Sequence, residues 1–336
     1  MNRPLNDKVM IMDKLNHEGL VHSDNYSETM AREVLPWINA RRTDMTVEGD
    51  GGRPLFVSRF DADAPAGTVL IVHGFTENAD KFSEVIHSLL QNGLSVVAYD
   101  QRGHGRSWRA EGLEDISLTH VDAFEEYVWD MGIVYDRVVK AMPKPHRVFC
   151  HSMGGAVTAL FLEGNPGLFD RAAMCAPMIA PCLNGLPKPA ARLMCQTEKA
   201  LGRCRKRIVG SKPYSGKEDF DTSPANGKAR FDWYEDQRGL HPEFTNNGPT
   251  YGWLLEAIDV TDKILAPGAP EGIDAEVRLY TAGLDETVLP EPQKAFIDRV
   301  KRGSHVTVPG GKHEIYRSSD DVLFPWWADV LGFLKG

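Results

Sequence analysis

The hydrophobic positions of this chain alternate between two patterns. Near-continuous apolar runs of strand length occupy residues 67–75, 94–100, 146–152, 171–177, 274–283 and 304–311. Apolar residues at helical spacing occupy the segments 81–93, 122–142, 154–166, 291–301 and 321–335. Strands that are apolar on both faces and alternate with amphipathic helices are typical of a mostly parallel sheet with helices on both faces. The pattern therefore predicts an α/β fold with right-handed crossovers.

Three stretches depart from this alternation. Residues 1–44 are polar and mixed, with a helix expected around 26–40 that Pro36 interrupts or bends. Residues 48–60 favour a hairpin with a Gly-Asp-Gly-Gly turn. The alternation lapses again over 178–258. We therefore predict an N-terminal extension over 1–44, an α/β core over 45–177 and 259–336, and an inserted helical cap over 178–258.

Composition and charge narrow the classes of function. The 336 residues carry a formal net charge of −9, so nucleic acid is not expected as a partner. The first residues contain no continuous apolar core, so we expect no signal peptide, and no apolar run approaches the ~20 residues of a transmembrane helix. Five widely spaced cysteines without a Cys-x-x-Cys pair favour a reducing compartment and argue against a zinc site. We expect a cytoplasmic protein without a metal; the sequence leaves its oligomeric state open.

A serine lies where one of the buried strands meets the helix that follows it. The stretch FCHSMGGAV, residues 149–157, places Ser152 on a sharp turn, and Gly154 and Gly155 provide the small residues that such a strained turn requires. The nucleophile-elbow pattern is Gly-x-Ser-x-Gly, and here Cys150 replaces the first glycine. Cysteine is small enough for that position, so we predict that Ser152 is a nucleophile; the alternative is a serine in an ordinary turn.

A serine nucleophile needs a general base and a group that orients the base. Because side chains converge at the carboxyl ends of parallel strands, these partners are expected in loops that follow later strands. Asp285 follows one late strand and His313 follows the next, which gives the chain order serine, acid, histidine. We predict that His313 is the general base on Ser152 and that Asp285 holds the tautomer of its imidazole.

Other polar residues compete for these roles. Glu286 and Asp274 are the rivals of Asp285. His305 is the rival of His313, but it lies inside a strand pattern and is expected to pack. Asp100 ends a buried strand, but the elbow position belongs to Ser152, so chemistry based on an aspartate nucleophile is disfavoured.

Two N–H donors are needed where negative charge develops on the substrate, and one such donor is worth ~3 kcal/mol. Met153, directly after the serine, is expected to supply one of them. The loop HGFTEN, residues 73–78, is expected to supply the other through Phe75, with His73 in a structural role. The Gly-rich stretch YDQRGHGRS, residues 99–107, lacks both nucleotide-binding glycine patterns. We interpret it as a turn that braces the site, with Arg102 paired to a carboxylate.

Taken together, these motifs resemble a known enzyme family. HGFTEN, YDQRGHGRS, CHSMGGAV, CAPM, GPTYGWLLEA, AGLDETV and PGGKHEIYRSSD occur in the order found in α/β-hydrolases of the lysophospholipase and monoacylglycerol-lipase group, from about Thr46 onward. The resemblance implies the α/β-hydrolase fold and hydrolysis of an ester of a single-acyl lipid, lysophospholipid or monoacylglycerol, through an acyl-enzyme and without a cofactor. Cys150 and the N-terminal extension depart from the family pattern.

The predicted cap reverses the overall charge of the chain. Its segment 188–217 contains one acid, Glu198, and nine basic residues: Lys188, Arg192, Lys199, Arg203, Arg205, Lys206, Arg207, Lys212 and Lys217. Four apolar residues fall near one helical face: Leu193, Leu201, Cys204 and Ile208. One interpretation is a basic amphipathic helix that contacts anionic lipid at the inner membrane surface; the other is a solvated cap helix.

The aromatic residues of the cap also have two interpretations. They line an acyl pocket, in which case the substrate-binding residues are Trp233, Tyr251 and Trp253, or they form the small core of the cap together with Phe231 and Tyr234. Two other functions stay open beside ester hydrolysis. One is a peptidase or amide hydrolase with the same three residues, and the other is a non-catalytic binding protein on a hydrolase fold.

Overall fold

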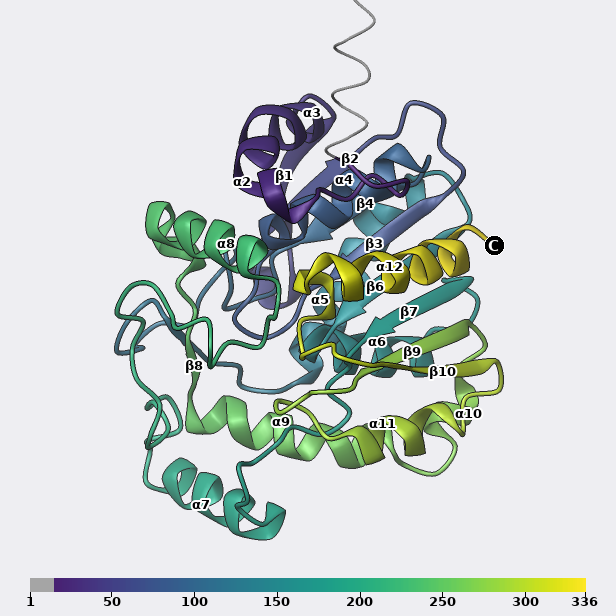
Figure 1. The fold of residues 1–336 in the computed structure, drawn as a ribbon. Helices are drawn as coiled ribbons and strands as arrows, with labels where there is room; N and C mark the ends of the chain where they lie inside the picture. Colours follow the sequence, from purple (N-terminus) through teal and green to yellow (C-terminus); the bar gives the residue numbers. More distant parts are fainter. Residues whose placement is uncertain (1–14) are drawn as a thin grey trace, which may run out of the picture.

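A computed structural model describes residues 15–336 and contains a central eight-stranded sheet (Figure 1). The strands lie in the order β1-β2-β4-β3-β6-β7-β9-β10. β2 is antiparallel to both of its neighbours, and all other pairs in the sheet are parallel. The bounds are β1 Arg42–Glu48, β2 Pro54–Phe60, β3 Thr68–Val72, β4 Ser95–Tyr99, β6 His146–His151, β7 Arg171–Cys175, β9 Glu276–Ala282 and β10 Gly303–Val308. The predicted α/β fold with a mostly parallel sheet is confirmed.

Helices cover both faces of the sheet, because successive side chains of its central strands point to opposite sides and both sides are apolar. In β3, Leu70 and Val72 join the hydrophobic core on one face, whereas Val69 and Ile71 join the core on the other. The first face packs against α5 Glu125–Arg137, α6 Met153–Gly164, α9 Tyr251–Ile264 and α11 Pro290–Ile297. The second packs against α4 Ser83–Gln91 and α12 Asp320–Lys335.

The N-terminal segment packs on the second face of the sheet. Its predicted helix is broken into α2 Tyr26–Thr29, a wider π-helical turn and α3 Leu35–Asn39, with Pro36 in the first turn of α3. Leu20 and Val21 are fully buried. The predicted hairpin is confirmed, since β1 and β2 are antiparallel neighbours joined by a short turn. β1 begins three residues before the predicted core, and residues 1–14 of the predicted extension lie outside the described residues.

The cap contains α7 Lys188–Ala200, α8 Lys228–Leu240 and β8 Gly248–Pro249. β8 pairs with β5 Leu118–Thr119, so the cap is hydrogen-bonded to the segment that follows β4. α9 runs across the predicted boundary between residues 258 and 259, and that boundary stays a prediction. α8 lies beside α2, whereas α7 lies beyond α9 at the lower end of the molecule (Figure 1).

The basic segment of the cap does not form one amphipathic helix. α7 ends at Ala200, and the residues after it form turns. Ile208 packs against the cluster of Cys195, Tyr251 and Leu255, whereas Leu193 and Leu201 are 64% and 58% exposed. Seven of the nine basic side chains form ion pairs: Lys188–Asp262, Arg192–Asp259, Arg203–Glu198, Arg205–Asp122, Lys206–Glu114, Arg207–Asp115 and Lys217–Asp232. The expected apolar face is therefore split, and most of the positive charge is neutralised locally.

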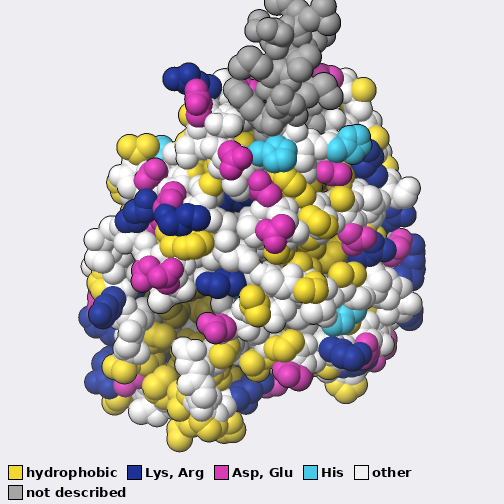
Figure 2. Space-filling model, in the orientation of Figure 1, with side chains coloured by type: hydrophobic (Ala, Val, Ile, Leu, Met, Phe, Trp, Pro, Cys, Tyr) yellow, Lys and Arg dark blue, Asp and Glu magenta, His cyan; other side chains and the backbone are white. Residues whose placement is uncertain are grey.

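Hydrophobic side chains are nevertheless prominent at this end of the molecule. Figure 2 shows them gathered at the lower end, where α7 lies in Figure 1. Among residues 15–336, no helix combines the length and the apolar character that crossing a membrane requires.

Candidate active site

Ser152 lies at a strained turn between β6, which ends at His151, and α6, which begins at Met153. Its backbone adopts φ +50° and ψ −119°, a conformation that a residue with a side chain rarely adopts. Backbone hydrogen bonds maintain the turn: the Ser152 N–H donates to the Cys175 carbonyl at 3.1 Å, and the Ser152 carbonyl accepts from the Met178 N–H at 2.8 Å. The strain lifts the hydroxyl out of the strand, as the sequence pattern predicts.

Close packing around the turn explains which neighbours must be small. A Cβ atom added to Gly154 would lie 2.1 Å from the Val72 carbonyl oxygen, so α6 packs against the end of β3 only because residue 154 is glycine. Cys150, at the position of the missing glycine, is fully buried in the core beside β7. Burial raises the pKa of its thiol to about 12. Cys150 is therefore an uncharged packing residue. Its side chain fits at the position where the nucleophile-elbow pattern has a glycine.

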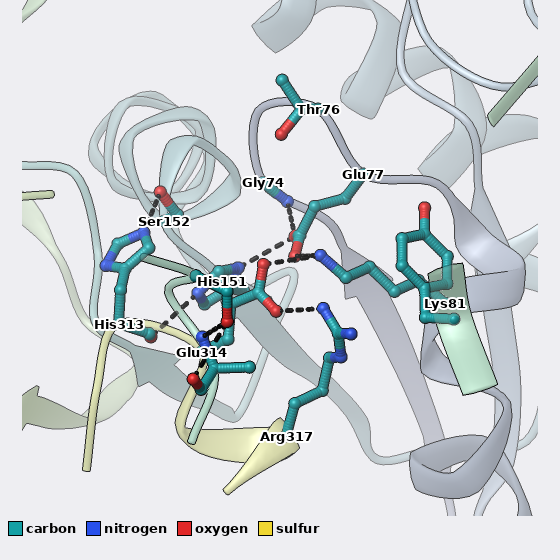
Figure 3. Close-up of polar contacts among 12 residues, drawn as sticks. Gly74, Thr76, Glu77, Lys81, His151, Ser152, His313, Glu314 and Arg317 are labelled. Carbon is teal, nitrogen blue, oxygen red and sulfur yellow. Dashed lines mark hydrogen bonds and ion pairs between the residues drawn. The ribbon is translucent and has the colours of Figure 1, made fainter. Parts of the chain in front are cut away.

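The structure brings the three predicted residues together. His313 Nε2 lies 2.8 Å from Ser152 Oγ, although the two residues are 161 positions apart (Figure 3). His313 Nδ1 lies 2.8 Å from Asp285 Oδ2. The other carboxylate oxygen of Asp285 accepts the N–H groups of Thr287 and Val288 at 2.8 and 3.1 Å. All three side chains extend from loops at the carboxyl ends of β6, β9 and β10.

The electrostatics of Asp285 suit the orientation of an imidazole. Burial alone would raise its pKa, but the hydrogen bond and charge of His313, with the N–H groups of Thr287 and Val288, lower it below the usual value. A carboxylate in this position accepts the Nδ1–H of His313 and leaves the lone pair of Nε2 facing the hydroxyl of Ser152. Such an arrangement is able to remove the hydroxyl proton when the oxygen attacks a carbonyl carbon.

The two predicted N–H donors lie in segments on either side of Ser152. Met153 is the first residue of α6, and the first four N–H groups of a helix have no acceptor within it. Phe75 directly follows Gly74, and a Cβ atom on Gly74 would lie 3.0 Å from the Cβ atom of Ser152. The loop after β3 therefore approaches the serine as closely as a glycine permits, and it brings the backbone of Phe75 to the site.

The rival residues lie elsewhere or make other contacts. Glu286 is exposed, and Asp274 is an exposed residue that precedes β9, at the strand end opposite Asp285. His305 lies within β10 and contacts Thr281 Oγ1 at 2.8 Å. His73 Nε2 accepts the Gln101 N–H at 2.9 Å, and burial lowers the pKa of His73 to about 4. A neutral His73 thus connects the loops after β3 and β4.

The Gly-rich stretch after β4 braces the site through buried charges. Arg102 donates two hydrogen bonds to the carboxylate of Asp130, at 2.6 and 2.8 Å, so the expected pairing with a carboxylate is confirmed. Asp100 accepts the Ala79 N–H at 2.7 Å and the Arg106 N–H at 2.8 Å. Burial raises the pKa of Asp100 to about 6 despite these hydrogen bonds. These contacts tie the loops that follow β3 and β4 to each other.

The three aromatic residues predicted to bind substrate lie in three different environments. The ring of Trp253 lies 4.0 Å from the ring of Phe75, beside the site. Tyr251 packs with Cys195 in the small core of the cap. Trp233 contacts the cluster of Val21, Tyr26, Met30 and Val34 in the N-terminal segment, and its assignment to an acyl pocket stays a prediction.

An apolar cavity of about 290 Å³ lies next to the segment that carries Asp285. Pro181, Leu183 and Leu186 line it from the loop after β7, and Ile258 and Leu289 line it from α9 and from the segment after Asp285. The Leu289 N–H donates to the Ala180 carbonyl at 3.0 Å, which joins the two segments. Sequence patterns alone did not indicate this cavity, because its walls come from three distant parts of the chain.

Sequence reasoning also missed a buried charged network beneath the serine. Glu77 contacts His151 and Lys81, and Glu314 contacts Lys81 and Arg317 (Figure 3). Glu77 lies in a short polar loop and Glu314 directly follows His313, and neither position carries a pattern that predicts a buried carboxylate. The only signal is indirect: both residues are next to segments that the motifs place at the site.

Comparisons with known proteins identify the family and relatives of this chain. The family described as serine aminopeptidase, S33, matches residues 63–320. Lysophospholipase L2 of Escherichia coli (strain K12) is 30% identical over 294 residues, which cover 83% of this chain and 84% of that protein. Monoacylglycerol lipase of Mycolicibacterium smegmatis is 27% identical over 42% of this chain and 49% of its own length.

Solved structures share the fold at low identity. A soluble variant of monoglyceride lipase from Saccharomyces cerevisiae, in complex with a substrate analogue, has a TM-score of 0.69 at 18% identity and covers 87% of this chain and 94% of its own. A carboxyl esterase from Bacillus coagulans also has a TM-score of 0.69, at 15% identity, over 88% of this chain and 98% of its own. With the match to residues 63–320 and the shared architecture, this chain belongs to the α/β-hydrolase family described as serine aminopeptidase, S33.

Proposed function

We propose that this protein hydrolyses carboxylic esters of single-acyl lipids, either lysophospholipid or monoacylglycerol. The observation that carries the proposal is the hydrogen-bonded series from Ser152 through His313 to Asp285, in which each contact measures 2.8 Å. The similarity to lysophospholipase L2 and to monoacylglycerol lipase supports a lipid ester as the substrate. The head group stays open between these two classes.

In the proposed mechanism, Ser152 attacks the ester carbonyl while His313 removes the proton from its Oγ. The N–H groups of Phe75 and Met153 donate hydrogen bonds to the carbonyl oxygen and stabilise the negative charge that develops on it. His313 then gives its proton to the oxygen of the leaving alcohol, and an acyl-enzyme forms on Ser152. A water molecule, deprotonated by His313, attacks the acyl carbonyl carbon. The bond between Ser152 Oγ and the acyl group then breaks, His313 returns the proton to Oγ, and the fatty acid is released. Asp285 stabilises the imidazolium of His313 during both steps.

The apolar cavity that reaches Leu289, in the segment after Asp285, supports an acyl chain as the group transferred to Ser152. Its walls come from aliphatic side chains, and its volume of about 290 Å³ suits an apolar chain segment. Trp253 does not line this cavity; its ring packs against Phe75. Burying a chain in this cavity contributes about 0.8 kcal/mol for each CH₂ group removed from water, so we expect kcat/KM to rise with chain length until the cavity is filled.

Covalent labelling tests the nucleophile. A fluorophosphonate is expected to modify Ser152 of the folded protein, and Ser152→Ala is expected to abolish both the label and ester hydrolysis. Asp285→Asn is expected to reduce kcat by about 10⁴-fold, whereas Glu286→Gln, its exposed neighbour, serves as a matched control and is expected to leave kcat unchanged. A folded protein without an adduct on Ser152 would favour the non-catalytic alternative.

Amide hydrolysis is the second candidate, because the family description names an aminopeptidase. Aminoacyl nitroanilides assayed beside p-nitrophenyl esters of varied chain length separate the two activities. We expect higher kcat/KM for the esters, and a preference for the nitroanilides would overturn the lipid assignment. A panel of monoacylglycerol and lysophospholipid in one detergent then decides the head group.

Peripheral contact with a lipid surface is also proposed, through the cap. Leu193 and Leu201 are exposed, whereas seven of the nine basic side chains of the cap segment form ion pairs. Ion-paired side chains have little free charge to offer an anionic membrane, so the contact is proposed to be apolar rather than electrostatic. A contact of this kind depends weakly on salt, and sedimentation with vesicles at low and high ionic strength tests it.

A further inference from the structure

Beneath Ser152 lies a buried network of alternating charges that the proposed mechanism does not use (Figure 3). Glu77 is at its centre, with a side chain that is 1% exposed. The two oxygens of this carboxylate face different parts of the molecule. Oε2 accepts the Gly74 N–H at 2.5 Å and lies 2.8 Å from His151 Nδ1. Oε1 lies 3.1 Å from Lys81 Nζ and accepts the hydroxyl of Tyr316.

The protonation state of His151 follows from its two neighbours. Its Nε2 lies 3.2 Å from the backbone carbonyl oxygen of His313, and a carbonyl can only accept a hydrogen bond. Its Nδ1 faces Glu77, and an ionised carboxylate also only accepts. Both ring nitrogens therefore donate, and His151 is an imidazolium. Burial alone would lower the pKa of His151, but the charge and hydrogen bond of Glu77 raise it.

These contacts join the two loops on which the proposed chemistry depends. One is the loop after β3, which Glu77 holds directly at Gly74. The other carries His313, whose carbonyl is held by His151. Both loops come within hydrogen-bonding or van der Waals distance of Ser152, yet they are more than 200 residues apart in sequence.

The loop after β3, to which Glu77 itself belongs, also contains a strained residue. Thr76 adopts φ +62°, a left-handed conformation that is unfavourable for a β-branched residue. Strain of this kind persists only where surrounding contacts enforce it. The short hydrogen bond from the Gly74 N–H to Glu77 spans Phe75 and Thr76 and so constrains this part of the loop.

We propose that Glu77 is a positioning residue of the hydrolase, which aligns the oxyanion loop and the His313 loop with Ser152 through its Oε2 atom and the imidazolium of His151. The inference rests on the proposed function, since it assigns Glu77 to the same reaction. Oε1 has a separate role, because Lys81 continues through Glu314 and Arg317 to backbone carbonyls of α8. One side of the carboxylate thus serves the reaction, and the other joins the core to the cap.

The test compares variants that affect one side of Glu77 or both. In Glu77→Gln, a neutral amide with one carbonyl oxygen replaces a carboxylate whose two oxygens receive four donors. The imidazolium of His151 therefore loses the negative charge that it faces, and the four donors no longer all have an acceptor. We expect kcat to fall about 10- to 100-fold with KM within about twofold, because the alignment stabilises the transition state and not the bound substrate. We expect a boronic acid, which needs the oxyanion site, to bind more weakly by a similar factor.

Tyr316→Phe is the matched control, since it removes one hydrogen bond from Oε1 and leaves Oε2 unchanged. We expect its kcat and its boronic acid affinity to stay within about twofold of the wild type. Equal losses in Glu77→Gln and Tyr316→Phe, or an unchanged kcat in a folded Glu77→Gln, would overturn the inference. If Glu77→Gln does not fold, His151→Gln takes its place, with the same expected loss of kcat and the same contradicting result.

The proposed function fails in a different way. It fails if the wild-type protein gives neither a fluorophosphonate adduct on Ser152 nor ester hydrolysis. If the wild type gives both and the variants of Glu77 and His151 match its kcat, only the positioning role is wrong. Glu77→Asp provides a further readout: its shorter side chain keeps the charge, and we expect it to recover part of the kcat that Glu77→Gln loses.

Discussion

The two helices of the cap, α7 and α8, are held to the rest of the molecule by opposite kinds of contact. α8 carries Arg230, whose side chain is 1% exposed and donates to Glu84 at 2.9 Å, to Asp320 at 2.7 Å and to the Val21 carbonyl at 2.7 Å. α7 rests on α9 through a small apolar cluster of Cys195 with Tyr251 and Leu255. It also forms the ion pairs of Arg192 with Asp259 and of Lys188 with Asp262, in which every side chain is at least 32% exposed.

The difference indicates which part of the cap is able to move. Exposed ion pairs contribute little to stability, whereas removing one partner of a buried pair costs several kcal/mol. α8 is joined by a buried arginine to the N-terminal segment, α4 and α12, so it forms a fixed wall of the molecule. Displacing α7 is therefore expected to cost less free energy than displacing α8. α7 also adjoins the apolar cavity, because its first residue, Lys188, is one of the residues that line the cavity.

The largest expected effect comes from breaking the buried connection. Arg230→Met leaves the carboxylate of Glu84 buried without its cation, and we expect the free energy of unfolding to fall by about 3–5 kcal/mol. Arg192→Met, the corresponding change in α7, is expected to lower it by less than about 1 kcal/mol. Urea unfolding of both variants measures the difference. Comparable losses for both would mean that the two helices are equally anchored.

A pH-dependent effect follows from the contact between the core and α8. Burial alone would raise the pKa of Glu314, but the charges of Lys81 and Arg317 lower it to about 2. A carboxyl group whose pKa is lower in the folded state stabilises the protein above its unfolded pKa of about 4.5, and this contribution disappears as the pH falls toward 2.

Glu314→Gln should therefore have a lower free energy of unfolding than the wild type at pH 6. The difference in unfolding free energy between the two proteins should narrow by on the order of 2–3 kcal/mol as the pH falls toward 2. Urea unfolding of both proteins at several pH values from 6 to 3 measures this difference in unfolding free energy. A difference that stays constant with pH would show that Glu314 has the same pKa in both states. Glu291→Gln, an exposed change in α11, is a control that is expected to leave the pH dependence unchanged.

Hydrogen exchange distinguishes the two helices without any substitution. Segments held by exposed contacts open with lower free energy than segments anchored in the core. We expect the backbone amides of α7, Lys188–Ala200, to exchange at least tenfold faster than those of α8, Lys228–Leu240, in the wild-type protein. Equal exchange rates in α7 and α8 would contradict a movable α7.

The smallest expected effect concerns contact with lipid. Leu193→Asp combined with Leu201→Asp places charges on the exposed apolar side chains at α7, and we expect several-fold weaker binding to neutral vesicles with little change in hydrolysis of soluble short-chain esters. Leu240, which ends α8 and is also exposed, offers the matched control Leu240→Asp, for which we expect no change in vesicle binding. Equal losses for the two helices would remove the distinction between them.

The sequence was sufficient to bring Ser152, Asp285 and His313 to one edge of the sheet. Each lies shortly after an apolar run of strand length, and the carboxyl ends of parallel strands meet at the same edge. Gly154 could be assigned in the same way, because a strained turn between strand and helix leaves no room for a side chain. These predictions needed only the local hydrophobic pattern of the chain and the geometry of a parallel sheet.

The side-chain contacts of the cap could not be predicted in the same way. Trp233 was predicted to bind substrate, and its observed contacts depend on the packing of α8 against the N-terminal segment, more than 190 residues earlier in the chain. The basic side chains after Lys188 suggested a charged surface, but their acidic partners include Asp115, Asp122 and Asp259, which come from other segments. A pattern within one segment does not reveal which distant side chains will neutralise it.

The sequence by itself determined the parallel sheet, the elbow serine and the order of its partners, because strand and helix periodicities are local and parallel strands align their ends. Only the tertiary structure decided that Glu77 and His151 are buried beneath the serine, that Arg230 anchors α8 and that the ion pairs of α7 with α9 are exposed. The physical reason is that a charge is stable in the interior only beside its partners, and those partners meet only once distant segments have packed together.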